Sequence, residues 1–93
     1  MLDFGKFSKY GKQTGEIVIT NTRKERLVIH NITTSCGCTQ VEYDKRPIVP
    51  GKSTILTVHY EAEEVGYFNK TIDIYSNTGI SPVKVQIKGE ALP

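Results

Sequence analysis

The sequence has no tryptophan, only two cysteines and no long hydrophobic run. A membrane-spanning helix needs roughly 18 or more consecutive apolar residues, and no segment approaches that length, so we expect no membrane insertion. The first residues, MLDFGKF, begin a strand-like pattern at once and lack the basic segment and apolar run of a secretory signal. Without tryptophan, a sugar-binding platform built on Tyr43, Tyr67 and Tyr75 is weakly supported, and cross-strand packing explains these tyrosines better.

The sequence also lacks a concentrated charge of one sign. Its 12 Lys and Arg residues stand against 10 Asp and Glu residues, for a net charge of +2. Glu25 interrupts the densest basic cluster, RKER at 23–26. Nucleic-acid binding normally uses a concentrated basic face, so we expect no nucleic-acid partner. The 93 residues, 38% of them hydrophobic and 24% charged, predict one small globular domain spanning 1–93.

Helical periodicity is nearly absent, and period-two alternation punctuated by Gly, Pro and Asn takes its place. Leu56, Val58 and Tyr60 fall on one face of a segment, and Val83, Val85 and Ile87 do so in another. The pattern predicts about seven strands, at residues 2–7, 15–21, 26–33, 40–43, 55–60, 67–75 and 81–90.

Seven short strands separated by turns are typical of an immunoglobulin-like β-sandwich, which is the fold class that we predict. A small barrel is the structural alternative. Residues 26–33 are apolar on both sides, with Leu27 and Ile29 on one face and Val28 and Ile32 on the other. Such a pattern suits a central strand or a strand that changes sheets.

The two cysteines, Cys36 and Cys38, are separated only by Gly37. In an extended strand their Cα atoms would lie about 6.6 Å apart, near the upper limit for a disulfide, and Gly37 allows the backbone to bend and bring them closer. Three interpretations stay open: two small buried side chains at a bend, a disulfide or redox pair, and a metal site.

The sequence does not supply the usual number of ligands for a zinc site at Cys36 and Cys38. Structural zinc sites use four ligands, usually in two pairs, and the chain has no second cysteine pair. His30 lies six residues upstream and is the candidate third ligand. A two-thiolate site for a soft ion such as Cu⁺ needs fewer ligands.

Other catalytic patterns are missing. There is no GxSxG elbow, and the eight glycines are dispersed rather than gathered in a phosphate-binding loop. His59 and Glu61 share a strand face, but an exposed histidine beside an acid explains them better than a catalytic dyad does. The acidic segment EAEEVG at 61–66 is expected to be a solvated turn. We therefore expect a protein that is not an enzyme and has no cofactor.

The segments SCGCT at 35–39 and PIVPG at 47–51, with GYFNKTIDIYSN at 66–77, resemble the bacterial domain of unknown function 1573 family, common in Bacteroidetes. The resemblance covers nearly all of the chain. It implies an immunoglobulin-like sandwich of the group that includes major sperm protein, pilus chaperones and ASH domains. It also implies export to the periplasm or cell surface, as part of a larger exported protein, and supplies no activity.

Relatives of this architecture mostly bind proteins, in some cases at a strand edge. We therefore expect a module for protein interaction or structural support in the cell envelope, with an unidentified protein partner. The loop at 45–52 offers candidate contact residues, namely Arg46, Pro47, Ile48, Pro50 and Gly51. The alternative function is a thiol site at Cys36 and Cys38 that binds a soft metal ion or acts in redox chemistry.

Overall fold

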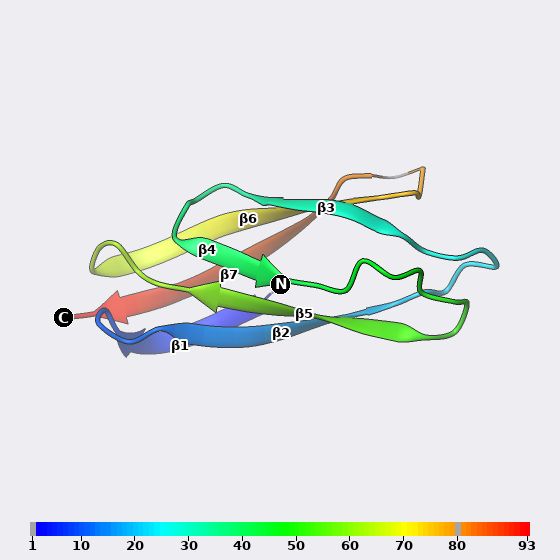
Figure 1. Cartoon of the computed structure of the whole chain (residues 1–93). Helices are drawn as coiled ribbons and strands as arrows, with labels where there is room; N and C mark the ends of the chain where they lie inside the picture. Colours follow the sequence, from blue (N-terminus) through cyan, green and yellow to red (C-terminus); the bar gives the residue numbers. More distant parts are fainter. Residues whose placement is uncertain (1, 80) are drawn as a thin grey trace.

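The computed structural model describes residues 2–79 and 81–93, and these form seven β-strands and no helix (Figure 1). The chain therefore holds no helical membrane span within these residues. The strands are β1 (Leu2–Ser8), β2 (Gln13–Thr20), β3 (Ile29–Thr34), β4 (Thr39–Glu42), β5 (Ser53–Tyr60), β6 (Gly66–Ser76) and β7 (Val83–Leu92). All seven predicted strands are present, and the largest difference is that β3 begins at Ile29 rather than at residue 26.

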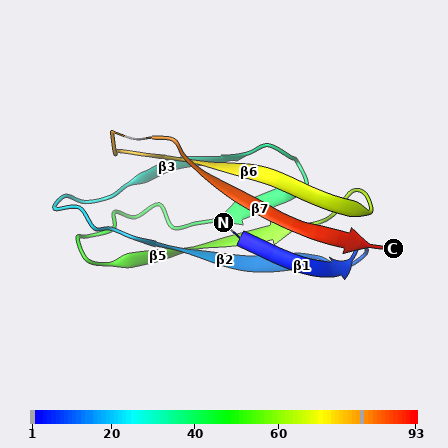
Figure 2. The ribbon, with the colours of Figure 1, turned by 180° about the vertical axis from the view of Figure 1, so that it is seen from behind.

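The strands form two sheets that pack face to face, so the sandwich prediction is confirmed and the barrel alternative is not. One sheet has the order β1-β7-β6-β3 and the other has the order β2-β5-β4. All neighbouring strands are antiparallel except β1 and β7, the first and last strands, which run parallel. Figure 2 shows these two strands side by side on the back of the molecule.

The core lies between the two sheets and is aliphatic at its centre. Leu56 and Val58 of β5 face Ile72 of β6 and Ile87 of β7, and all four are fully buried. Burial of each such side chain stabilises the fold by about 1.5–3 kcal/mol relative to exposure. The period-two pattern predicted the inward faces of β5 and β6, whereas Val83 at the start of β7 is exposed.

One end of the core is aromatic. Phe4 and Phe7 of β1 meet Phe68 of β6 and Tyr60 of β5. The rings of Tyr60 and Phe68 stack with centroids 4.1 Å apart and planes inclined by 16°. Gly89 of β7 lies against this stack, because a Cβ atom there would approach the Phe68 ring to 2.9 Å.

A bulge in β3 corrects the predicted faces of that strand. Ile29 pairs with Ser76 and Asn31 pairs with Tyr75, so His30 is an extra residue with no partner opposite it. The extra residue brings both Ile29 and Ile32 to the core, although three positions separate them. The prediction that Ile32 faces away from Ile29 is therefore wrong.

Candidate functional site

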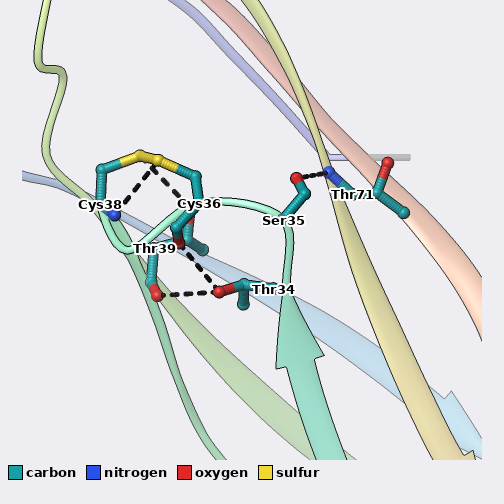
Figure 3. The surroundings of a disulfide bond; sticks show 6 residues. All are labelled: Thr34, Ser35, Cys36, Cys38, Thr39 and Thr71. Atoms are coloured by element: carbon teal, nitrogen blue, oxygen red, sulfur yellow. Dashed lines mark hydrogen bonds between the residues drawn. A yellow bond between two sulfur atoms is a disulfide. The ribbon is translucent and has the colours of Figure 1, made fainter.

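The Cys-Gly-Cys segment forms the turn between β3 and β4, and its cysteines are joined in a disulfide (Figure 3). The Cα atoms of Cys36 and Cys38 lie 5.2 Å apart, closer than in an extended strand. Both residues are half-buried, and Cys38 packs against the edge of the core. Of the three open interpretations, the disulfide is the one that the structure contains.

Hydrogen bonds from two directions fix the first half of the turn. Ser35 N–H donates to Thr71 O at 3.0 Å, and the Ser35 hydroxyl accepts from Thr71 N–H at 2.9 Å (Figure 3). The Thr34 hydroxyl donates to Cys36 O at 2.9 Å. The two Ser35–Thr71 bonds tie the start of the turn to the neighbouring strand β6, and none of the three bonds involves a sulfur atom.

The second half of the turn is fixed in the same way to β4 and β5. The Thr39 N–H donates to Cys36 O at 3.2 Å, and Glu61 N–H donates to Cys38 O at 3.1 Å. Thr39 itself is buried, and it pairs with Tyr60 across the β4–β5 ladder. The positions of both cysteine backbones are therefore set by the sandwich.

Gly37 is not needed for the bend, contrary to the prediction. Its φ angle is not positive, unlike those of Gly5, Gly51 and Gly66. A Cβ atom at Gly37 would meet nothing within 4 Å. Any small residue fits this backbone, so the bend follows from the hydrogen bonds around it.

An open hollow of about 410 Å³ lies beside the turn. It is bounded by the turn itself, by the end of β5 and by the following acidic segment, and its lining residues are Lys12, Gly37, Cys38, Gln40, His59, Tyr60, Glu61, Ala62 and Glu63. The disulfide is thus placed at the wall of a solvent-accessible concavity.

Glu63 brings a carboxylate to the two sulfur atoms. A carboxylate oxygen of Glu63 and both Sγ atoms all lie within 4.8 Å of one another. The same residue acts on Tyr60, whose phenol pKa is raised, first by burial and then by the negative charge of Glu63. Cysteine, tyrosine and glutamate therefore meet at one end of the sandwich.

The predicted third ligand, His30, does not belong to this group. His30 is exposed at the bulge near the start of β3, whereas the cysteines follow the end of that strand. The four residue-to-residue steps from His30 to Thr34 span roughly 13 Å at the usual rise of a strand. The structure places Glu63 beside the sulfurs instead, and the assignment of Cys36 and Cys38 as metal ligands stays a prediction.

His59 and Glu61 do not form a pair either. The His59 ring places Nδ1 3.2 Å from the Thr14 hydroxyl, and Nε2 lies 3.5 Å from a carboxylate oxygen of Glu42. The acid beside His59 is therefore Glu42 on the adjacent strand β4. This is a cross-strand surface cluster, and among residues 2–79 and 81–93 the Thr14 hydroxyl is the only nucleophilic group within hydrogen-bonding distance of the ring.

The predicted contact loop at 45–52 is partly inside the protein. Ile48 is buried and exchanges two backbone hydrogen bonds with Leu27, of 2.9 and 2.8 Å. It anchors the loop to the core and is not available to a partner. Arg46, Pro47, Pro50 and Gly51 are exposed.

Arg46 is held by an acid two residues before it. Its guanidinium donates to both oxygens of Asp44, with a shortest distance of 2.6 Å. These hydrogen bonds, together with one of 2.8 Å from the backbone N–H of Arg46, lower the Asp44 pKa from 3.8 to about 2. The exposed tyrosine surface is smaller than the sequence suggested, because Tyr67 is exposed whereas Tyr43 and Tyr75 are half-buried.

Solved structures share this fold. A protein of unknown function from Porphyromonas gingivalis superposes with a TM-score of 0.85 at 25% identity, over 96% of this chain and 43% of that one. The VesB protease of Vibrio cholerae superposes with a TM-score of 0.80 at 15% identity, over 96% of this chain and 29% of the protease chain. The secreted serine protease VesC of Vibrio cholerae superposes with a TM-score of 0.76 at 17% identity, over 97% of this chain and 21% of the protease chain. The chain thus spans less than half the length of each.

The sequence matches no curated protein of known function. It does match a family defined by sequence, and the match extends over residues 1–91. This range includes both cysteines, the acidic segment after β5 and all but the end of β7. The chain belongs to the family described as Protein of unknown function (DUF1573).

Proposed function

We propose that this domain is a non-enzymatic protein-interaction module of the bacterial cell envelope, and that a partner strand adds to the open edge of β2. The observation that carries the proposal is the regularity of that edge. β2 pairs with β5 through eight consecutive residues without a bulge. An unpaired edge of this kind offers a row of backbone donors and acceptors to another chain.

The other edges of the described sheets are less suitable. β1 is interrupted by a register shift between Asp3 and Lys6, and β3 by the bulge at His30. β4 has only four residues. Bulges and short strands are the usual devices that protect an edge, and β2 has neither.

The hydrogen bonds of Asn21, the residue after β2, indicate which backbone groups of β2 point toward the open edge. Asn21 N–H donates to Lys52 O and Asn21 O accepts from Gly51 N–H, so both groups point toward the β5 side. Because these directions alternate along a strand, Ile19 and Ile17 also bond toward β5. The N–H groups of Thr20, Val18 and Glu16 then face the open edge.

The outward side chains of β2 indicate the chemistry of the partner strand. Val18 is 62% exposed and lies directly opposite Ile55, which is 51% exposed, on the outer face of the sheet. Glu16 is the one charged residue of β2. An added strand with an apolar residue beside Val18 and a basic residue beside Glu16 would complement this edge.

The disulfide supports placement in the envelope. Disulfides form and persist in oxidising compartments, including the bacterial periplasm, and are rare in the reducing cytosol. In the three solved structures the fold occupies 43%, 29% and 21% of the chain. Those proportions support a role as one domain of a larger exported protein.

The proposal is tested by photo-crosslinking from the edge in the bacterium that makes the protein. A photoreactive residue at Thr20 should give a discrete protein adduct, and the same residue at Gln86, on the outer face of the other sheet, should not. Val18→Pro removes a donor that faces outward and leaves the β2–β5 bonds in place. It should abolish the adduct, whereas Val18→Ala should weaken it only partly.

Circular dichroism and thermal unfolding must show that Val18→Pro is folded. An adduct that persists in folded Val18→Pro, or one that forms equally from Gln86, would exclude strand addition at β2. A catalytic turnover by the purified domain would contradict the non-enzymatic part of the proposal.

A further inference from the structure

The position of the disulfide indicates that it contributes little to the stability of the fold. It joins residues only two apart in sequence, at a turn that already connects β3 to β4. A cross-link constrains the unfolded chain in proportion to the logarithm of the loop that it closes, and a three-residue loop is close to the lower limit. Both cysteines are also half-buried rather than inside the core, and Cys38 lines the wall of the hollow.

The turn would keep its shape without the sulfur–sulfur bond. Four hydrogen bonds, with Thr34, Thr39, Glu61 and Thr71, hold three backbone groups of the turn: Ser35 N–H, Cys36 O and Cys38 O. Cys38 N–H also donates to Cys36 Sγ at 3.2 Å (Figure 3), a bond that a thiolate at Cys36 can accept as well. Reduction therefore leaves two thiols side by side in a fixed backbone.

Glu63 makes this pair a set of three ligands. Its carboxylate oxygen and both Sγ atoms lie within 4.8 Å of one another. Zinc binds thiolate sulfur at about 2.3 Å and carboxylate oxygen at about 2.0–2.2 Å, in tetrahedral geometry. Neighbouring ligands of such an ion are roughly 3.5–4 Å apart by the same bond lengths. The two sulfurs must therefore move apart after reduction, whereas the Glu63 oxygen already lies within 4.8 Å of both.

We infer that the reduced chain binds one Zn²⁺ ion between the thiolates of Cys36 and Cys38 and the carboxylate of Glu63. The hollow leaves a fourth position open to water or to a group from another molecule. Lys12 lines the same hollow and partly offsets the negative charge of the three ligands. This inference goes beyond the proposed function and does not depend on the β2 edge.

The oxidation state of the pair then decides whether the metal binds. A small dithiol attacks one sulfur, the Cys36–Cys38 bond breaks, and the dithiol leaves as its own cyclic disulfide. Two electrons and two protons pass from the dithiol to the two cysteines. Binding of Zn²⁺ displaces the two thiol protons, because only thiolates are ligands, and the disulfide form has no thiolate to offer.

The experiment compares the oxidised and reduced domain. The protein is reduced with dithiothreitol, freed of reductant by anaerobic gel filtration and titrated with Zn²⁺ in competition with a chromophoric chelator. Co²⁺ is used as a spectroscopic probe, because thiolate ligation gives a charge-transfer band in the near ultraviolet. One ion per chain and a thiolate–cobalt band should appear only in the reduced domain.

Glu63→Gln and Glu64→Gln provide a matched pair, since each removes one negative charge from the same exposed segment. Glu63→Gln should weaken Zn²⁺ binding about tenfold or more, in the range typical when a metal site loses a supporting group. Glu64→Gln should change it less than about twofold. Circular dichroism establishes that both variants are folded.

Three results would overturn the inference. The first is that the reduced domain binds Zn²⁺ no more tightly than the oxidised domain. The second is a stoichiometry of one ion per two chains, which would mean a site shared between molecules. The third is an equal effect of Glu63→Gln and Glu64→Gln, which would remove Glu63 from the ligand set.

Discussion

The side-chain amide of Asn21 donates a hydrogen bond of 2.7 Å to Ile48 O, at a position where Asn21 is only 1% exposed. The same amide donates to Glu25 O at 2.8 Å, and its Oδ1 accepts from Arg23 N–H at 3.0 Å. One buried side chain therefore connects the turn after β2 to the loop before β5.

Replacing Asn21 by Ala should destabilise the domain. Glu25 O would lose its donor and Arg23 N–H its acceptor, whereas Ile48 O would keep its bond from Leu27 N–H. Each group left unsatisfied away from water costs about 1–3 kcal/mol. We expect the free energy of unfolding, measured by urea denaturation, to fall by about 2–4 kcal/mol. Thr22→Ala, at the exposed next position, should change it by less than about 0.5 kcal/mol. Equal values for the two variants would contradict this role of Asn21.

The Asp44–Arg46 pair should contribute to stability in a pH-dependent way. The folded pKa of Asp44, about 2, lies below its ordinary value of 3.8. The contribution is therefore present above about pH 4 and is lost as the pH falls toward 2. Carboxyl carbon NMR should give an Asp44 midpoint of about 2 in the native protein and a higher midpoint in Arg46→Gln. The midpoint of the variant should stay below 3.8, because the backbone N–H of residue 46 still donates to Asp44. Lys45→Gln serves as the control, and a midpoint that is unchanged in Arg46→Gln would disprove the assignment.

Replacement by alanine should destabilise the domain at Gly89 and should be neutral at Gly37. A Cβ atom at Gly89 would lie 2.9 Å from the Phe68 ring and 3.0 Å from Gly5 O. Because Phe68 is stacked on Tyr60, it cannot move aside easily, and we expect Gly89→Ala to cost about 1–3 kcal/mol, as for an overpacked core. Gly37→Ala should be neutral to within about 0.5 kcal/mol. Thermal unfolding of both variants checks this, and a tolerated Gly89→Ala would show that the ring can move.

Loss of the disulfide should leave a folded domain. The loop-closure relation gives about 1.6 kcal/mol for a three-residue loop. The double variant Cys36→Ser with Cys38→Ser should therefore lose less than about 2 kcal/mol by urea denaturation and keep its β-sheet circular dichroism. Unfolding of this variant in native buffer would show that the bond holds the sandwich together.

The fold was largely predictable because alternation in this sequence is strong. Leu56, Val58 and Tyr60 read as one face of a strand, and they line the core. The register within β3 was not predictable, since one extra residue at His30 reverses the face of every later side chain. Nothing local to His30 marks a bulge.

The sequence predicted only the part of the site whose residues are neighbours in the chain, which is the cysteine pair. Cys36 and Cys38 stand out because they are two apart, whereas Glu63 comes 25 residues after Cys38 and reaches them through the packing of the segment after β5. The only sequence feature that marked Glu63 was the acidic segment at 61–66, and this segment was predicted to be a solvated turn. Ile48 was mistaken for a contact residue because a Pro-rich loop hides its pairing with Leu27.

The parallel pairing of β1 with β7 has a consequence for the order of assembly. Among the described residues, β1 has no sheet partner except β7, and 85 positions separate Leu2 from its partner Ile87. Within this domain, the strand that is synthesised first must therefore wait for the one that is synthesised last. The four-stranded sheet completes only when β7 has been synthesised, so until then the core-facing Phe7 of β1 lacks the neighbouring strand beside which it is buried in the finished fold.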